Sequence, residues 1–257
     1  MGLTYAKGIH NAQLLSDAIM VLEKGTENID RLKKAEPQFN VFENPEDCIA
    51  AADIIMVAVK PFHCADVFKI IKPFVRKNQV IISVMAGVKI STIQTALGLD
   101  KIIRSMPNLP AMINKGMTTF TGSDQVSEEE IAIVKGLLGS TGKAIQVKSE
   151  EDIDKSTGLS GSGSAYIFYF MEAMMESAKE MGFSDVDAKT ITCQTFDGAV
   201  DLFNQKNDST SEWINRVCSK GGTTIAAINT FEDNKVKSNI KKGIFAAYHR
   251  AIELGNS

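Results

Sequence analysis

The spacing of hydrophobic positions changes near residue 150, and this change divides the chain into two parts. In residues 1–149, short apolar runs alternate with amphipathic stretches, and residues 54–59 are apolar throughout. Such a run is typical of a strand in a parallel sheet covered on both faces, so we predict a strand at residues 53–59. Further strands are predicted at 18–22, 40–42, 79–84, 101–105, 117–120 and 144–147, and helices at 1–17, 26–34, 44–52, 62–76, 91–97 and 127–138. This alternation predicts a doubly wound, Rossmann-like α/β domain with a parallel sheet.

Residues 150–257 carry no strand pattern and are predicted to be all helical. The helices are expected at 152–159, 165–181, 185–205, 211–217, 224–231 and 236–254, with a break at residues 160–164 and a glycine cap at Gly182. Residues 165–178 are apolar on most faces, so this helix needs partners on several sides. We therefore predict that residues 150–257 form a dimerisation domain.

Small, polar or proline-containing loops follow four of the predicted strands. These loops are Glu23-Lys24, Val59-Lys60-Pro61, Ala86-Gly87 and Met106-Pro107-Asn108. Ligands of doubly wound folds bind at the carboxyl ends of the strands, so the loops indicate a dinucleotide crevice; tight strand-to-helix turns explain them equally well. An acid after the second strand suits ribose hydroxyls and a base suits a 2′-phosphate. Having both Glu23 and Lys24 leaves NAD and NADP open.

A second candidate site lies in the helical part, where Gly221-Gly222-Thr223-Thr224 opens an apolar helix. The glycines allow the backbone to bend closely around a ligand, and the threonines stand where a helix N-cap belongs. The first turn of a helix offers free backbone N–H groups and partial positive charge, which suit a small carboxylate or phosphate. An ordinary glycine turn with a threonine cap is the alternative.

Composition excludes several classes of protein. The chain has 257 residues, 44% of them hydrophobic, a formal net charge of -3 and a pI of about 5.7. It has no basic cluster, so no nucleic-acid partner is expected, and its apolar runs are too short to span a bilayer. No secretory signal pattern is present, and four scattered cysteines lack metal-ligand spacing. We expect a cytoplasmic protein with reduced thiols and no bound metal.

Several motifs resemble those of the pyrroline-5-carboxylate reductase family. The similarity runs from Met1 to Gly255 and rests on the segments Ala58–Pro61, Ala86-Gly87, Arg104–Ala111, Gly158–Tyr166, Ser219–Ile225 and Glu253–Gly255. Three residues depart from the family pattern: Leu109 replaces a threonine, and Ser164 and Lys220 replace prolines. Met1-Gly2 resembles the end of the family's glycine-rich loop. We therefore expect the first strand and most of that loop to be missing, which would leave an open edge at residues 19–22.

The resemblance implies an enzyme that reduces 1-pyrroline-5-carboxylate to L-proline with NADPH or NADH, the last step of proline biosynthesis. It also implies a homodimer or a decamer built as a pentamer of dimers. One alternative is a truncated, cofactor-deficient paralogue that dimerises without catalysis. Another is a related imine or β-hydroxyacid dehydrogenase, which the Gly-Gly-Thr-Thr motif disfavours.

The resemblance also assigns roles to residues. Thr224 would hydrogen bond the ring nitrogen as a relay or orienting group, because a threonine is too weak an acid to do more. The substrate carboxylate would bind at Gly221, Gly222 and Thr223, with Ser162 nearby. The cofactor would be bound by Gly2, Glu23, Lys24, Asn44, Val59, Lys60, Pro61, Ala86, Gly87, Pro107 and Asn108, with Met106 also bordering the nicotinamide.

Overall fold

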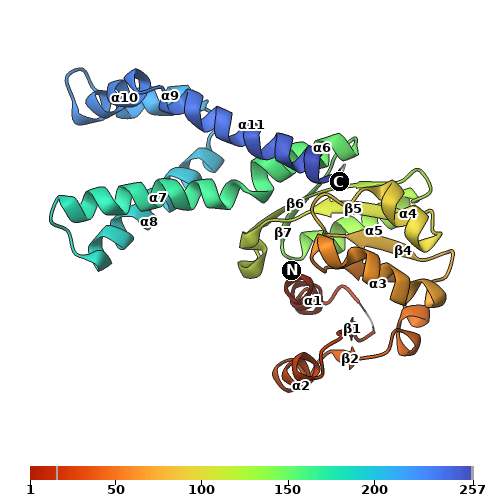
Figure 1. Cartoon of the computed structure of the whole chain (residues 1–257). Helices are drawn as coiled ribbons and strands as arrows, with labels where there is room; N and C mark the ends of the chain where they lie inside the picture. Colours follow the sequence, from red (N-terminus) through yellow and green to blue (C-terminus); the bar gives the residue numbers. More distant parts are fainter. Residues whose placement is uncertain (16, 256–257) are drawn as a thin grey trace. The chain divides into compact units, whose positions relative to one another are not determined.

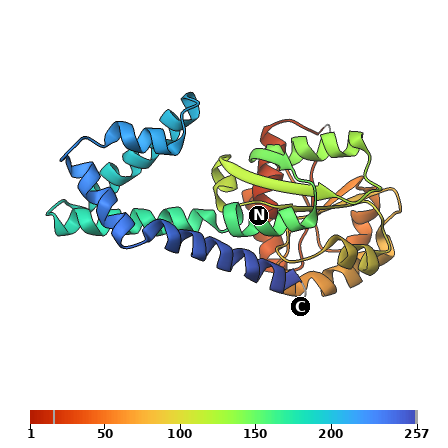
Figure 2. The same cartoon turned by 90° about the horizontal axis from the view of Figure 1, so that it is seen from above.

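The computed structural model describes residues 1–15 and 17–255, which form two compact units (Figures 1 and 2). The sheet unit consists of Met1–Ser162 together with the C-terminal segment from Ala246, and the helical unit is Gly163–Phe245. The predicted order, a sheet-containing part followed by helices, is confirmed. The last helix, α11 (Val236–Gly255), has residues in both units.

The sheet unit contains two separate sheets. The strands are β1 (Met20–Leu22), β2 (Asn40–Phe42), β3 (Ile54–Val57), β4 (Val80–Ser83), β5 (Ile102–Met106), β6 (Gly116–Gly122) and β7 (Gly142–Gln146). A five-stranded sheet has the order β3-β4-β5-β6-β7, in which the β5–β6 pair alone is antiparallel. The second sheet is the parallel pair β1 and β2 (Figure 1). Within the described residues β1 and β3 share no ladder. The open edge expected at residues 19–22 is therefore present.

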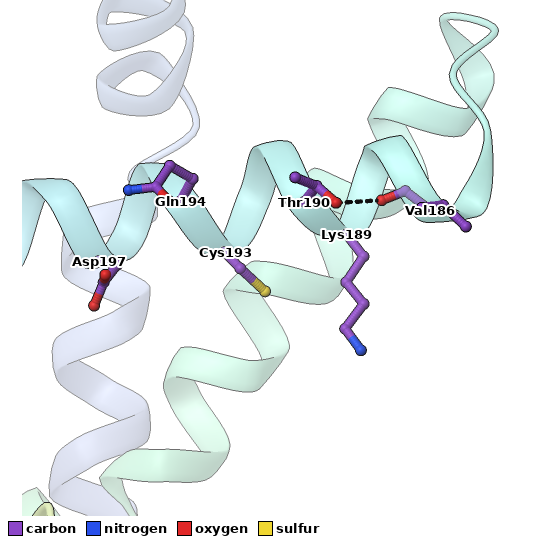
Figure 3. Close-up of a pocket in the computed structure, with 6 residues that line it drawn as sticks. All are labelled: Val186, Lys189, Thr190, Cys193, Gln194 and Asp197. Carbon is purple, nitrogen blue, oxygen red and sulfur yellow. Dashed lines mark hydrogen bonds between the residues drawn. The ribbon is translucent and has the colours of Figure 1, made fainter.

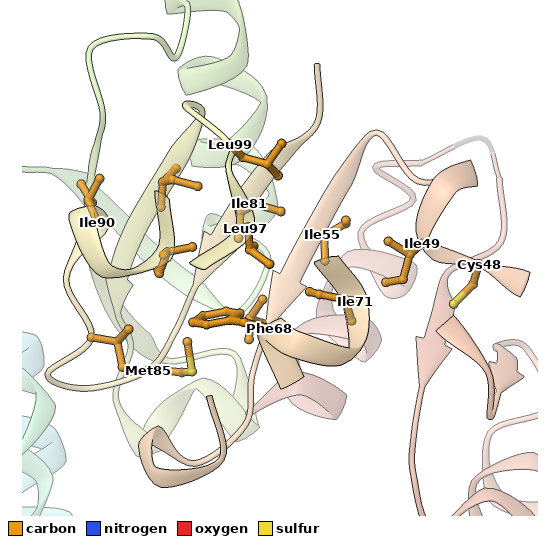
Figure 4. Close-up of a cluster of buried hydrophobic side chains, with 14 residues drawn as sticks. Cys48, Ile49, Ile55, Phe68, Ile71, Ile81, Met85, Ile90, Leu97 and Leu99 are labelled. Carbon is orange, nitrogen blue, oxygen red and sulfur yellow. The ribbon is translucent and has the colours of Figure 1, made fainter. Parts of the chain in front are cut away.

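Helices cover both faces of the five-stranded sheet. Those of the sheet unit are α1 (Gly2–Asn11), α2 (Thr26–Ala35), α3 (Cys64–Ile71), α4 (Ile90–Leu97), α5 (Glu128–Gly139) and α6 (Glu150–Ser156). One buried cluster joins α3 and α4 to the sheet through Phe68, Leu97 and Ile81 (Figure 4). The second joins α1 and α5 to the opposite face through residues that include Tyr5 and Ile82. Neighbouring residues of β4 enter different clusters because successive strand side chains point to opposite faces.

Three predicted helices are shorter than expected. The helix predicted at 1–17 ends at Asn11, and Gln13 takes the left-handed conformation with φ 52°; residue 16 of that prediction lies outside the described residues. Residues 44–52 form two 3₁₀ turns, because Cys48 leaves helical geometry with φ -136°. Residues 62–76 contain α3 between two 3₁₀ turns. Pro73 lies in the second turn, where its missing N–H and its ring oppose continuation of the α-helix.

The helical unit has very little core of its own. It contains α7 (Gly163–Glu180), α8 (Asp185–Gln205), α9 (Thr210–Val217), α10 (Thr223–Asp233) and the first half of α11. α7 and α8 pack together, with Phe170 and Phe196 in an edge-to-face contact at 5.9 Å. Within Gly163–Phe245, all of it described, Ala188 and Thr192 are the buried residues. Most of the apolar side chains of this unit remain available to a partner.

Candidate functional site

The three parallel strands β3, β4 and β5 end at one edge of the sheet. Val57 pairs with Ser83, and Ser83 pairs with Arg104, so the strands are in register there. The segments that follow these strands are Val59-Lys60-Pro61, Ala86-Gly87 and Pro107-Asn108. The structure therefore brings three of the predicted cofactor segments to the same edge, where α/β folds bind their ligands.

The first turn of α1 lies against the end of β3. A methyl group added at Gly2 would lie 3.1 Å from the Cβ atom of Ala58, which follows that strand. The first backbone bond of the helix runs from Tyr5 N–H to the Met1 carbonyl at 3.0 Å, and no side chain caps this helix end. The N–H groups of residues 2–4 thus have no partner within the helix, a donor set that fits a phosphate group.

Two buried contacts fix α1 on the sheet. The Tyr5 hydroxyl is 2.8 Å from Oγ1 of Thr118, and burial raises the Tyr5 pKa above its ordinary value. Gly8 packs so closely that an added methyl group would lie 2.7 Å from Cγ2 of Thr141. The position of the open helix end is therefore set by packing well away from it.

The adenosine-side candidates follow the smaller sheet. Glu23 comes directly after β1, its N–H donates to the Phe42 carbonyl at 3.1 Å, and its carboxylate accepts the Lys24 N–H at 3.1 Å. Asn44 follows β2 and is exposed. Because β1 and β2 are parallel and in register, the three predicted residues lie at one end of this sheet. Carboxylate and ammonium groups are both present there, so NAD and NADP remain equally compatible.

The loops after β4 and β5 contact residues far along the chain. Gly87 has φ +75°, and an added methyl group would lie 3.1 Å from Cβ of Leu254 in α11. The Asn108 side chain accepts the Met117 N–H at 2.8 Å and donates through Nδ2 to the Ser160 carbonyl at 3.3 Å. Both polar groups of Asn108 therefore have partners within the protein.

A buried ion-pair network, which was not predicted as a site, lies beside these loops. The guanidinium of Arg104 on β5 is 1% exposed, and it contacts Oε1 of Glu150 at 3.1 Å and Oδ1 of Asp154 at 2.5 Å. The same Glu150 oxygen accepts the N–H of Ile90, the first residue of α4, at 2.9 Å. An arginine inside an apolar strand was the available signal in the sequence, because an arginine is rarely fully buried without a partner.

The break predicted at residues 160–164 is narrower than expected. Residues Thr157–Gly161 form a π-helical turn that continues α6, α7 begins at Gly163, and Ser162 between them donates its N–H to the Thr157 carbonyl at 3.0 Å. This bond to the fifth preceding residue is typical of a π-turn, and π-turns are frequent at functional sites. Gly158 is needed because a methyl group there would lie 2.7 Å from the Tyr248 nitrogen. The predicted substrate-side residue Ser162 directly follows this turn.

The Gly-Gly-Thr-Thr motif opens α10 in the helical unit, but its cap differs from the prediction. Gly221 has φ +73°, Gly222 is the N-cap, and Thr223 and Thr224 are the first two helical residues. No side chain caps the helix, so the predicted threonine cap is wrong; Gly222 is the N-cap because the glycine turn ends, and the helix begins, one residue earlier than expected. The Thr224 hydroxyl is consequently not committed to capping. These four residues belong to the helical unit, whereas the cofactor segments and Ser162 belong to the sheet unit.

Among the described residues no cluster of histidine, cysteine or acidic side chains could hold a metal ion, no helix is long and apolar enough to cross a membrane, and the four cysteines are free. A pocket in the helical unit contains none of the predicted site residues. It is lined by α8 residues, with Lys189 and Cys193 pointing one way and Thr190 and Gln194 another (Figure 3).

Comparison with known proteins agrees with this arrangement. Residues 150–254 match the family model described as "Pyrroline-5-carboxylate reductase dimerisation", and residues 1–87 match "NADP oxidoreductase coenzyme F420-dependent". A solved pyrroline-5-carboxylate reductase from Coxiella burnetii is 29% identical, with a TM-score of 0.90 over 100% of this chain and 95% of that one. A pyrroline carboxylate reductase from Plasmodium falciparum, solved with NADP bound, is 25% identical with a TM-score of 0.88, over 99% and 94% of the two chains.

A curated relative shows to which protein family the chain belongs. Pyrroline-5-carboxylate reductase of Pseudomonas aeruginosa is 31% identical over 250 residues, which span 97% of this chain and 89% of that protein. The match thus extends over both the sheet unit and the helical unit. The chain belongs to the pyrroline-5-carboxylate reductase family.

Proposed function

We propose that this chain reduces 1-pyrroline-5-carboxylate to L-proline, the last step of proline biosynthesis. The observation that carries the proposal is the common edge formed by the ends of β3, β4 and β5, beside the uncapped start of α1. Relatives that match 97% and 100% of this chain are named pyrroline-5-carboxylate reductase. NADPH or NADH supplies a hydride when it is bound.

The chain's own residues would hold the dinucleotide from several sides. The N–H groups beginning at Gly2 suit the pyrophosphate, and Glu23, Lys24 and Asn44 suit the adenosine ribose and its substituents. The nicotinamide side would be lined by Val59, Lys60, Pro61, Ala86, Gly87, Pro107 and Asn108. The preference between NADPH and NADH depends on how the adjacent Glu23 and Lys24 meet the ribose.

The substrate side follows from the chemistry of an imine. Its carbon accepts a hydride more readily when the ring nitrogen is protonated or hydrogen bonded. The backbone N–H groups of Gly222 and Thr223, on the turn formed by Gly221, would hold the carboxylate. The Thr224 hydroxyl would hydrogen bond the ring nitrogen and orient it. Ser162, which follows the π-turn, would border the same substrate.

Assembly and location complete the proposal. The chain carries the family's dimerisation domain, and the nearly coreless helical unit supports a homodimer. We further propose that the dimers assemble into a decamer, as a pentamer of dimers, and that the protein is cytoplasmic. Residues 1–149 would bind the cofactor, and residues 150–257 would bind the substrate and form the dimer. Light scattering at several protein concentrations would distinguish a dimer from a decamer.

The proposed activity is tested by adding 1-pyrroline-5-carboxylate to the purified chain with NADPH or NADH and following cofactor oxidation and proline formation. Equimolar oxidation and proline production would support the reductase. A folded dimer that binds neither dinucleotide would instead favour the cofactor-deficient paralogue. The ratio of the two kcat/KM values gives the cofactor preference.

A further inference from the structure

Asn108 lies in the loop after β5, where the resemblance predicts contact with the nicotinamide. Its side chain is already engaged on both sides: Oδ1 accepts the Met117 N–H at 2.8 Å, and Nδ2 donates to the Ser160 carbonyl at 3.3 Å. An asparagine amide has two N–H donors and an oxygen with two lone pairs. One donor and one lone pair are used here to connect β6, the loop and the π-turn.

A second contact joins the same two segments independently. A methyl group at Gly161, in the π-turn, would lie 2.6 Å from Cε of Met106, the last residue of β5. The Met106 side chain therefore packs directly against Gly161, and a methyl group there would have to displace the flexible end of that side chain. The loop after β5 and the π-turn are held together by a hydrogen bond and by close packing.

The π-turn also contacts the C-terminal helix and leads directly into Ser162. Gly158 lies so close to α11 that an added methyl group would lie 2.7 Å from the Tyr248 nitrogen. A shift of the loop relative to the turn would consequently be transmitted to the residue that borders the proposed substrate site. Gly158, Ser162 and Tyr248, like the loop after β5, all belong to the sheet unit.

We propose that Asn108 is a positioning residue: although the residue borders the nicotinamide side, its side-chain amide acts by fixing the β5 loop to the π-turn, which aligns the two reactants, and not by a hydrogen bond to the cofactor. The proposal rests on the proposed reductase function. Small errors in the relative placement of reacting groups lower the rate of the chemical step strongly, whereas ground-state binding is affected less. The loss should therefore appear in kcat more than in cofactor affinity.

The test is Asn108→Asp, which keeps the acceptor for the Met117 N–H and removes the donor to the Ser160 carbonyl. Asn114→Asp is the matched control, because Asn114 is an exposed residue of the same connection and receives the same charge. We expect Asn108→Asp to lower kcat about 10-fold and to leave the NADPH Kd, measured by fluorescence titration, within about 2-fold. The control should leave both values unchanged.

Two outcomes would overturn the proposal. An unchanged kcat would show that the link is dispensable, and a weakened NADPH Kd with unchanged kcat would make Asn108 a direct cofactor contact. If Asn108→Asp does not fold, Asn108→Ala provides the test, because it removes both side-chain hydrogen bonds without adding a charge, and the same two outcomes apply to it.

A readout without turnover separates this proposal from the proposed function. Hydrogen exchange at residues 157–162 is measured on the full chain in the absence of cofactor, and the Ser162 N–H is the most informative group. Exchange should be several-fold faster in Asn108→Asp than in the control. Faster exchange in a chain that has no reductase activity would support the link and reject the reductase, while unchanged exchange would reject the link.

Discussion

Arg104 and Asp154 form a buried ion pair across 50 residues of sequence, with Nη2 of the arginine 2.5 Å from Oδ1 of the aspartate. The pair joins the central strand β5 to α6, and Glu150 extends it to the first N–H of α4. The strands and helices that carry the predicted nicotinamide loops are therefore tied to the segment that leads toward the substrate residues.

Asp154→Ala should lower the free energy of unfolding by about 3–5 kcal/mol, because it leaves the Arg104 charge buried with one carboxylate fewer. The matched control is Glu151→Ala on the same helix, whose carboxylate contacts Lys155 and is 63% exposed. A change below about 1 kcal/mol is expected there. Urea unfolding at one fixed protein concentration measures both, and equal losses for the two variants would contradict the assignment.

Gly8→Ala should destabilise the protein by about 1–3 kcal/mol, since the new methyl group would lie 2.7 Å from Thr141 and 2.9 Å from Oγ of Ser140. Gly136→Ala is the opposite case. Gly136 lies within α5 and an added methyl group there meets nothing within 4 Å, so the variant should gain about 0.4–1 kcal/mol. Thermal unfolding of the two variants should move the midpoint in opposite directions; an unchanged or raised midpoint for Gly8→Ala would disprove the packing of α1.

Glu130 makes stability depend on pH. Burial raises its pKa, but the bonds from Lys101 Nζ, at 2.6 Å, and from Ser127 N–H outweigh burial, and the net pKa lies below the ordinary value of 4.5. A lowered folded pKa means that the stabilisation is complete above about pH 4.5 and is lost as the pH falls through the folded value. Glu130→Gln should therefore cost stability at pH 7 and progressively less below pH 4.5. A difference that stays constant over this range would exclude the charge effect.

Thr224→Val should lower kcat about tenfold or more while the protein stays folded, because valine keeps the shape of the side chain and removes the proposed donor to the ring nitrogen. Thr224→Ser should retain most of the activity. Thr230→Val is the control on the same helix, where the hydroxyl donates to the Ala226 carbonyl at 3.0 Å. Steady-state kinetics with saturating NADPH provides the comparison, and full activity of Thr224→Val would remove Thr224 from the mechanism.

Elements with a strong local signal were predictable from sequence. The strand at Asn40–Phe42 and the helix at Asp185–Gln205 have the predicted bounds, the helix because Ser184 accepts the Asp187 N–H at its start. The split of residues 44–52 into two turns was not predictable, since its composition alone suits a helix. The N-cap was predicted one residue too late, at Thr223, because the residue types do not reveal that Gly221 takes a positive φ and that the helix begins directly after Gly222.

Contacts between distant residues explain what sequence reasoning missed at the candidate site. The segments after β3, β4 and β5 were predicted because strand ends can be located from the hydrophobic pattern. The partners of Arg104 lie 46 and 50 residues away, and no local pattern identifies them. The partner of Asn108 was not predictable either. Ser160 belongs to a π-turn, and its run of small residues had suggested a break in the helix.

The nearly coreless helical unit has a consequence for how the protein matures. Residues 163–245 bury two residues within a single chain, so a lone copy gains little hydrophobic stabilisation from ordering these helices. Their folding then becomes a bimolecular event governed by mass action, and the fraction of native protein rises with the amount of chain synthesised. In a cell that makes little of this protein, newly synthesised chains would remain incompletely folded until two of them associate. During that time they would be exposed to chaperones and proteases.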